Sequence, residues 1–211
     1  MTNNQLPLEP IGSPAKSVRR DAAENRVLIL QTAEKLFEDH GVDAVNMADI
    51  AQAAGVGKGT LYRRFSNKGE LCLALMDSQM TEFQDGMLAR MQTLSEQGVS
   101  KLEQLDQFID ALVHFTDIHS PLLCVAQRAG LLEGENEAIQ LPHFWQYMTV
   151  KGLMRSAQID GELASNLDID YFADAILSPL QADIFRYQRQ VREFSLDRIS
   201  AGLRHLVSGL K

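Results

Sequence analysis

Residues 48–65 read Ala48-Asp-Ile-Ala-Gln-Ala-Ala-Gly-Val-Gly-Lys-Gly-Thr-Leu-Tyr-Arg-Arg-Phe65, and this stretch decides the fold. Two short helical segments meet at a turn that contains Gly55, and Ala51, Val56 and Leu61 are placed to pack between them. A small residue where two helices touch, a glycine in the turn and apolar residues joining the pair form the pattern of a helix-turn-helix. The sequence therefore predicts a helix-turn-helix here.

The second helix of this motif is rich in groups that bind DNA. From Gly55 to Gly69 there are four basic residues and no acidic one, although the whole chain has a net charge of −8. Such a basic cluster is typical of phosphate binding, and the start of a recognition helix lies within reach of base edges. A solvated basic face is the alternative for Arg63 and Arg64. The residues expected to contact DNA are Gly57, Lys58, Gly59, Thr60, Tyr62, Arg63, Arg64 and Lys68.

A phosphate-binding P-loop is excluded for the same glycine-rich stretch. That motif requires a glycine, four further residues and then Gly-Lys-Ser/Thr, and it follows a strand. Here Lys58 is followed by Gly59, position 52 is Gln, and the preceding segment is helical. The glycines are better explained by the close approach of backbone to DNA.

Charge divides the chain into two parts. Residues 1–70 hold nine Lys/Arg and nine Asp/Glu and are neutral overall, whereas residues 71–211 hold eleven and nineteen and carry the whole charge of −8. Two parts with such different charge indicate different partners. We predict a disordered arm over 1–20, which is rich in proline and ends in basic residues, a DNA-binding domain over 21–67 and an effector-binding and dimerisation domain over 68–211.

The composition is that of an ordinary soluble protein, with 45% apolar and 23% charged residues. The longest uninterrupted apolar run, Leu71–Met76, has six residues, far short of the roughly 20 that span a bilayer. The N-terminus lacks the basic and apolar segments of a secretion signal. Cys72 and Cys124 lie in apolar stretches and are interpreted as reduced core thiols. We therefore expect a cytoplasmic protein with no membrane partner.

Helical periodicity runs through the chain, and no segment alternates at period two for long enough to form a strand. Asn46 followed by Asp49 predicts a capping box at one helix start, and Ser178-Pro179 predicts a kink. The expected fold class is all-α, with a three-helix DNA-binding head and a helical body. The expected helical segments are 21–40, 46–54, 60–65, 67–91, 101–118, 122–132, 142–158, 168–190 and 195–210.

Residues 28–71 resemble the DNA-binding domain of the tetracycline-repressor (TetR) family. The resemblance covers about a fifth of the chain, in family order and spacing, and is carried by Ala33-Glu-Lys-Leu-Phe37, Gly41, Asp49-Ile-Ala51, Ala54-Gly-Val56, Gly59-Thr-Leu-Tyr62, Phe65 and Lys68-Gly-Glu-Leu71. It implies a DNA-reading head on a larger all-α body, and a Tyr62 hydroxyl that reaches a phosphate. Proteins of this family are mostly homodimeric repressors that a small molecule releases from palindromic operators.

An apolar stripe at helical spacing runs along the segment 67–91. Such a stripe is more often core than binding surface, but methionine is adaptable and also suits a pocket for apolar ligands. For Arg128, which lies in an apolar segment, a salt bridge within the chain and an anion-binding role are equal alternatives. The residues expected to bind an effector are Met80, Phe83 and Met87, with Phe108, Leu112, Phe115, Arg128, Trp145 and Met148 as further candidates.

No sequence pattern supports catalysis or a metal site. His114 and His119 are five residues apart, about 140° around a helix, and so cannot share a metal as residues four apart do. The sequence has neither Gly-x-Ser-x-Gly nor His-Glu-x-x-His. We therefore expect no cofactor and no enzymatic activity, and an all-α enzyme is the least favoured hypothesis.

The segments 168–190 and 195–210 carry long apolar stripes that need a partner surface. Two such helices that pair with their copies form a four-helix bundle and a closed homodimer; packing on the chain's own body is the alternative. The leading hypothesis is a homodimeric transcriptional repressor that a small apolar or amphipathic effector releases from a palindromic operator. The alternative is a DNA-binding regulator without an effector, whose body serves only dimerisation.

Overall fold

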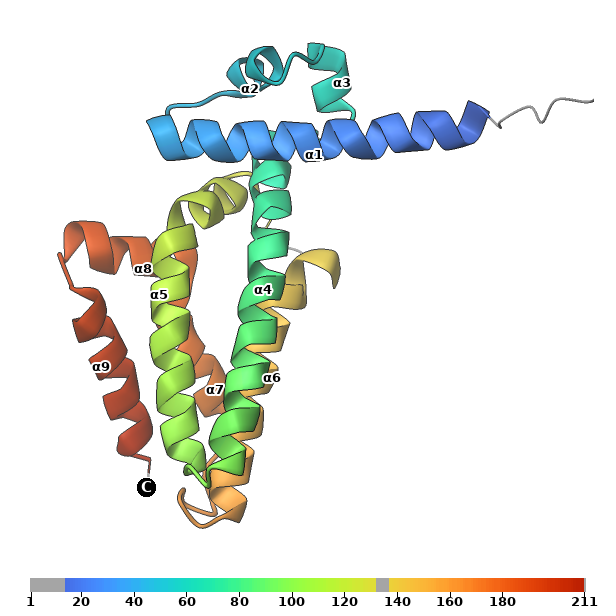
Figure 1. Cartoon of the computed structure of the whole chain (residues 1–211). Coiled ribbons are helices and arrows are strands. Elements are labelled where there is room, and N and C mark those ends of the chain that lie inside the picture. The colour runs from blue at the N-terminus through green and yellow to red at the C-terminus, as the bar shows by residue number, and fades with distance from the viewer. Residues whose placement is uncertain (1–13, 132–136, 211) are drawn as a thin grey trace, which may run out of the picture. The chain divides into compact units, whose positions relative to one another are not determined.

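The computed structural model describes residues 14–131 and 137–210, and every regular element in these ranges is a helix (Figure 1). The expected all-α fold class is confirmed. The chain forms two compact units, Met1–Ser66 and Asn67–Lys211. The elements, where η1 is a 3₁₀ turn and η2 a π-helical turn, are α1 Pro14–His40, α2 Met47–Ala53, α3 Lys58–Tyr62, α4 Lys68–Glu96, α5 Lys101–Arg128, α6 Glu137–Ile159, α7 Ile169–Leu177, η1 Ser178–Leu180, α8 Ala182–Arg186, η2 Tyr187–Val191 and α9 Leu196–Ser208.

The first unit consists of α1, α2 and α3 around a small apolar core. Ile29 of α1, Ile50 of α2 and Leu61 of α3 are fully buried. Asn46 accepts the backbone N–H of Asp49 at 3.1 Å, and the Asp49 carboxylate accepts the backbone N–H of Asn46 at 2.8 Å. The predicted capping box is therefore confirmed, and it fixes where α2 begins.

Helix α1 begins at Pro14, inside the range that was expected to be a disordered arm. The structure therefore differs from the prediction over residues 14–20, whereas residues 1–13 of the predicted arm lie outside the described residues. Proline is favoured in the first turn of a helix because its missing N–H would have had no partner there. The alanines and charged residues that follow are good helix formers, so this proline marks a helix start.

The second unit is a bundle in which α5 is the central helix, packed against α4, α6, α8 and α9 (Figure 1). Among the described residues, α5 alone is long and apolar enough to cross a membrane by length and composition. Its apolar residues are nevertheless used inside the bundle, since Phe108, Ile109 and Leu112 are fully buried. This packing accounts for part of the apolar composition of α5, whereas Ile118 of the same helix is 72% exposed.

The expected segments 101–118 and 122–132 form one helix, because α5 continues through Pro121 to Arg128. The prediction of separate helices over 101–118 and 122–132 was wrong. Proline removes the N–H that would bond to the carbonyl of residue 117. The Ser120 hydroxyl donates to that carbonyl at 3.2 Å, so the carbonyl keeps a partner and the helix tolerates the proline.

The expected helix over 168–190 is divided at Pro179 into α7, η1, α8 and η2. The Ser178 hydroxyl donates to the Asp174 carbonyl at 2.8 Å, and the Gln188 side-chain amide donates to the Pro179 carbonyl at 2.9 Å. The second bond satisfies a carbonyl that a continuous helix would have paired, whereas the Asp174 carbonyl also accepts the Ser178 backbone N–H. The predicted kink is confirmed, but it ends one helix and starts another.

The first turn of α4 lies very close to the end of α5. Asn67 caps α4 by accepting the backbone N–H of Glu70 at 3.0 Å. A Cβ atom on Gly69 would lie 2.6 Å from the Cβ of Ala129 and 2.9 Å from the Cδ1 of Leu131. Only glycine fits at this position without displacing its neighbours.

Candidate DNA-binding surface and effector site

Helix α2, the turn 54–57 and α3 form the predicted helix-turn-helix. Gly55 has a φ of +65°, which glycine adopts without the steric cost of a side chain. The Val56 N–H returns to the Ala51 carbonyl at 3.0 Å and closes the turn. Because Leu61 is fully buried, it holds α3 on the head and leaves the opposite side of α3 facing outward.

The head residues predicted to contact DNA lie on this outward side. Tyr62 is 51% exposed, and the Arg63 Nη2 atom donates to the Thr60 hydroxyl at 3.1 Å. A Cβ atom on Gly59 would meet nothing within 4 Å, so the backbone there is open to an approaching surface. Gly57, Lys58, Gly59, Tyr62, Arg63 and Arg64 are exposed, Thr60 is half-buried, and Lys68 is half-buried in the second unit.

One basic residue near the recognition helix was missed by sequence reasoning. Arg26 of α1 is exposed, and its guanidinium lies 5.6 Å from the centroid of the Phe65 ring, within cation–π range. Phe65 itself is buried. Arg26 is distant from the motif in sequence, so only the fold brings its charge to the end of α3.

Four aromatic residues predicted to bind an effector come together in the second unit, and we call them the aromatic cluster. The Phe83 ring of α4 lies 4.4 Å from that of Phe115 of α5 and 6.1 Å from that of Trp145 of α6, measured between centroids. Trp145 lies 5.6 Å from Phe108. The tilted and edge-to-face geometries are those that aromatic pairs prefer. The cluster therefore joins three helices.

The aromatic cluster lies on a buried core and reaches the surface on one side. Met87 and Leu112 belong to the core against which Phe83 and Trp145 pack, and Met80 is buried. Phe83 and Trp145 are only partly buried. Met148 is exposed on α6, as is Phe144. The structure thus brings the apolar candidates of α4 and α5 together with Trp145 and leaves Met148 outside the packed core.

Arg128 lies elsewhere, at the C-terminal end of α5. Its Nε atom donates to the Cys124 carbonyl at 3.2 Å. It lines an open hollow of about 460 Å³ together with Arg186 and Tyr187. A second open hollow, of about 660 Å³, is lined by residues of α4, α5 and α9. No residue of the aromatic cluster lines either hollow.

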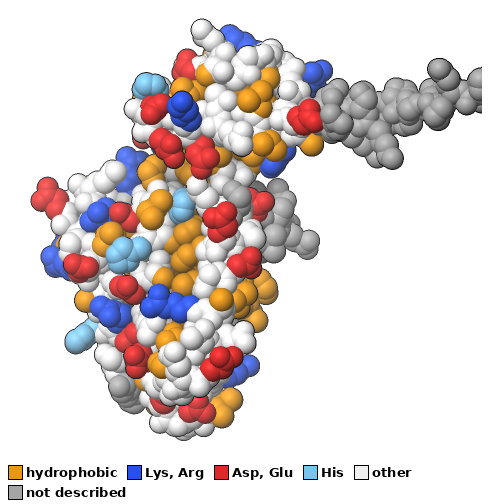
Figure 2. All heavy atoms as spheres, viewed as in Figure 1, with side chains coloured by type: hydrophobic (Ala, Val, Ile, Leu, Met, Phe, Trp, Pro, Cys, Tyr) orange, Lys and Arg blue, Asp and Glu red, His pale blue; other side chains and the backbone are white. Residues whose placement is uncertain are grey.

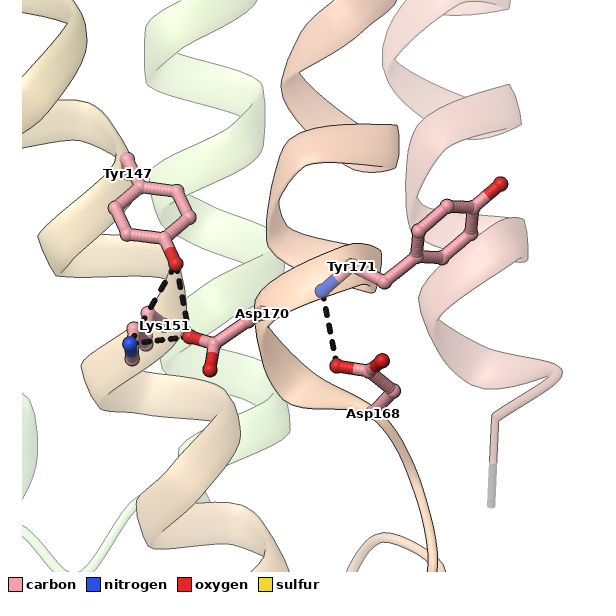
Figure 3. Close-up of polar contacts among 5 residues, drawn as sticks. All are labelled: Tyr147, Lys151, Asp168, Asp170 and Tyr171. Carbon is pink, nitrogen blue, oxygen red and sulfur yellow. Dashed lines mark hydrogen bonds and ion pairs between the residues drawn. The ribbon is translucent and has the colours of Figure 1, made fainter.

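Helix α6, which carries Trp145, is tied to α7 by polar contacts that sequence reasoning missed (Figure 3). The Tyr147 hydroxyl donates to the Asp170 carboxylate at 2.8 Å, and Lys151 forms an ion pair with the same carboxylate. These bonds raise the pKa of Tyr147 and of Lys151 and lower the pKa of Asp170. Asp168 caps α7 by accepting the N–H of Tyr171 at 3.1 Å. The spacing of Tyr147 and Lys151 was visible in the sequence, but their partner on another helix was not.

The two histidines of α5 have different surroundings. His114 is exposed, and its Nδ1 atom lies 2.8 Å from the Asp110 carbonyl oxygen. His119 is buried, with its ring centroid 4.2 Å from that of Phe115. Within the described residues, no group of three or more His, Cys, Asp or Glu side chains could hold a metal ion.

Comparison with known proteins agrees with this arrangement. Residues 29–75 match the family described as bacterial regulatory proteins, tetR family. The chain is 28% identical over 181 residues to the HTH-type transcriptional regulator SAR2658 of Staphylococcus aureus (strain MRSA252), a match that covers 85% of this chain and 90% of that protein.

Solved structures share the fold over most of the chain. FadR from Bacillus subtilis in complex with stearoyl-CoA is 19% identical with a TM-score of 0.63, covering 88% of this chain and 98% of that chain. A transcriptional regulator from Saccharomonospora viridis in complex with choline is 20% identical with a TM-score of 0.63, covering 88% and 96%. The family match contains the entire helix-turn-helix and its basic residues. The chain therefore carries a DNA-binding domain of the tetR family of bacterial regulatory proteins, and it is similar in fold to transcriptional regulators.

Proposed function

We propose that this regulator is a homodimeric repressor, which leaves a palindromic operator when a small apolar or amphipathic molecule binds its body. The observation that carries the proposal is the combination, in one chain, of an exposed basic recognition helix and an aromatic cluster that reaches the surface. The exposed residues at the start of α3 suit contacts to base edges, and Arg63 and Arg64 suit contacts to phosphates.

The proposed dimer forms through α8, η2 and α9. Ile184, Tyr187, Val191 and Leu206 expose large apolar side chains on these elements, as does Ile118 on α5. On the face of the second unit that carries α5 and α9, apolar side chains form a strip flanked by charged ones (Figure 2). Contiguous exposed apolar surface marks protein–protein interfaces, and two-fold pairing of one surface with its copy gives a closed dimer.

The proposed effector binds at the aromatic cluster. Rings from three helices form an apolar surface, so a ligand bound there would contact α4, α5 and α6 together. FadR of Bacillus subtilis in complex with stearoyl-CoA and the Saccharomonospora viridis regulator in complex with choline are proteins of this fold with chemically different small molecules. Their example supports a bound effector and leaves its identity open.

Release from DNA requires that the effector bind the DNA-incompetent state more tightly. A coupling free energy of about 1–3 kcal/mol is typical, and by reciprocity DNA must weaken effector binding by the same factor. A shift of a few ångströms in the spacing of two heads is enough to break register with two half-sites. The proposal therefore requires an effector whose affinity falls when operator is present.

The test uses an operator selected from random double-stranded DNA with the full-length protein. Compounds that raise the melting temperature of the protein are then tested, by fluorescence anisotropy, for their ability to release it from that operator. Phe83→Trp is expected to blunt release while leaving operator affinity unchanged, because it alters the proposed site. Tyr171→Trp, a matched change at an exposed ring of α7, is expected to behave like the parent. If stabilising compounds never change operator affinity, the regulator without an effector is favoured instead.

A further inference from the structure

An open hollow of about 460 Å³ lies between the C-terminal end of α5 and the elements α8 and η2, and we call it the α5–α8 hollow. Most of its wall is apolar, and Cys124 of α5 and Tyr187 and Val191 of η2 contribute to it. Small-molecule sites are typically concave spaces of about 300–1,000 Å³ with apolar walls and a few polar groups. The α5–α8 hollow therefore has the size and the lining of a ligand site.

Two arginines from different elements line the α5–α8 hollow. The Nε atom of Arg128 donates to the Cys124 carbonyl at 3.2 Å, and that of Arg186 donates to the Gln190 side-chain oxygen at 3.0 Å. The outer nitrogens of Arg186 make no hydrogen bond to any described residue. Arg186 is thus held in place by one nitrogen and can donate to a ligand with the others.

The charges around the hollow favour a ligand with one negative charge. Asp183 also lines it, and its carboxylate accepts the Ile184 backbone N–H at 2.8 Å. Among the described lining residues, two guanidinium groups and one carboxylate give one net positive charge, although residues 71–211 together carry −8. An anion between two guanidinium groups offsets their mutual repulsion. The planar donors of arginine match a carboxylate in geometry.

The end of α5 does not oppose an anion at this place. The last carbonyls of a helix carry partial negative charge when they are unpaired. Here the carbonyls of residues 125–127 accept the backbone N–H groups of residues 129–131 at 2.8–3.1 Å. Because these carbonyls are paired, the arginines determine the sign of the local charge.

The wall formed by η2 has an irregular backbone. The Arg192 N–H bonds to the Tyr187 carbonyl at 3.0 Å, five residues back, which is the π-helical pattern. Glu193, which follows, has a φ of +52°, a conformation that is costly for a residue with a side chain. π-helical turns and residues in costly conformations occur frequently at functional sites. The backbone thus supports a binding role for this wall.

We infer that the α5–α8 hollow is a second ligand site and that it binds an amphipathic monocarboxylate. Arg128 and Arg186 hold the carboxylate, and the apolar part of the ligand lies against Tyr187 and Val191. The site goes beyond the proposed effector site, because no residue of the aromatic cluster lines this hollow. Tyr187 and Val191 are also exposed on the surface proposed for the dimer, so the ligand would lie at the edge of that interface.

Isothermal titration calorimetry on the full-length protein tests the site and the ligand class. The probes are octanoate, octyl phosphate, 1-octanol and octyltrimethylammonium, which share an eight-carbon chain and differ in the head group. Octanoate is expected to bind about tenfold more tightly than octanol, because only octanoate forms charge-assisted hydrogen bonds. Arg186→Gln is expected to weaken octanoate binding about five- to tenfold, a loss moderated by the exposure of this side chain, and to leave octanol binding unchanged.

Matched variants separate a ligand contact from a change of net charge or of fold. Arg186→Lys keeps the charge but loses the planar donors, so it is expected to bind octanoate with intermediate affinity. Arg192→Gln, at an exposed arginine that does not line the hollow, is expected to bind octanoate like the parent, as is Phe83→Trp in the aromatic cluster. Without ligand, Arg186→Gln is expected to melt at the parent's temperature, because the side chain is exposed.

Equal octanoate affinity in the parent and in Arg186→Gln would overturn the inference, and an equal loss in Arg192→Gln would show a general charge effect and overturn it as well. Tighter binding of octanol or octyl phosphate than of octanoate would overturn the ligand class. Octanoate binding that depends on Phe83 and not on Arg186 would place the molecule at the aromatic cluster. If no probe gives heat or raises the melting temperature, the site is refuted. Octanoate binding that depends on Arg186 but leaves operator affinity unchanged supports the site and says nothing against the proposed effector.

Discussion

The salt dependence of operator binding tests the recognition surface directly. Each chain is expected to present Lys58, Arg63, Arg64 and Lys68 to phosphates, so the proposed dimer presents twice that set. Each phosphate contact contributes about 0.9 to the slope of log affinity against log salt, so full engagement gives a slope of about −7. Affinity should then fall roughly 10⁴-fold between 50 and 200 mM salt.

Arg64→Gln removes one exposed cation from each head. The slope is expected to change from about −7 to about −5, because two phosphate contacts are lost per dimer. Arg155→Gln, at an exposed position of α6, changes the net charge equally and is expected to leave the slope unchanged. Anisotropy titrations of labelled operator at four salt concentrations measure the slope for each variant and for the parent. A slope for Arg64→Gln that matches the parent's would refute the assignment of Arg64 to a phosphate.

Deleting residues 1–20, which removes the first turns of α1 together with three basic residues, is expected to weaken operator binding; unchanged affinity would show that the segment does not bind DNA. Ile184→Glu, at a side chain 40% exposed, is expected to give a helical monomer in sedimentation velocity, and a surviving dimer would place the interface elsewhere. Leu203 is 3% exposed, so Leu203→Glu should instead unfold the body. Glu162 accepts two N–H groups at the start of α5, each at 3.0 Å, so Glu162→Ala should lower the free energy of unfolding in urea by about 1–2 kcal/mol. Burial alone would raise the pKa of Glu162, but these hydrogen bonds hold it below its usual 4.5. Their stabilisation is therefore present above pH 4.5 and is lost as the pH falls through the lowered pKa. The control, Asp160→Ala, should leave the free energy of unfolding nearly unchanged.

The head could be predicted from the sequence because its determinants are local. Asn46 and Asp49 cap a helix within one turn, and Gly55 closes a turn between adjacent helices. The prolines were harder to interpret. Pro14 begins a helix, and Pro121 lies inside one because the neighbouring hydroxyl replaces its missing bond. Whether a proline ends a helix depends on which group satisfies the freed carbonyl, and a helical pattern does not contain that information.

The body's site was only partly predictable, because its members come from different helices. The apolar spacing of α4 indicated which face of that helix is buried, but the contacts of Phe83 with Phe115 and Trp145 depend on how α4, α5 and α6 pack. Arg128 lies apart from this cluster, although it shares a helix with Phe115.

The absence of a side chain at Gly69 has a mechanical consequence for α4. Because a methyl group there would overlap Ala129, the first turn of α4 and the end of α5 are separated by no spare space. Contacts of this kind resist compression steeply and separation only weakly. An advance of the end of α5 by a few tenths of an ångström would therefore displace residue 69. Lys68, which is expected to hold a phosphate, immediately precedes that contact and would move with it.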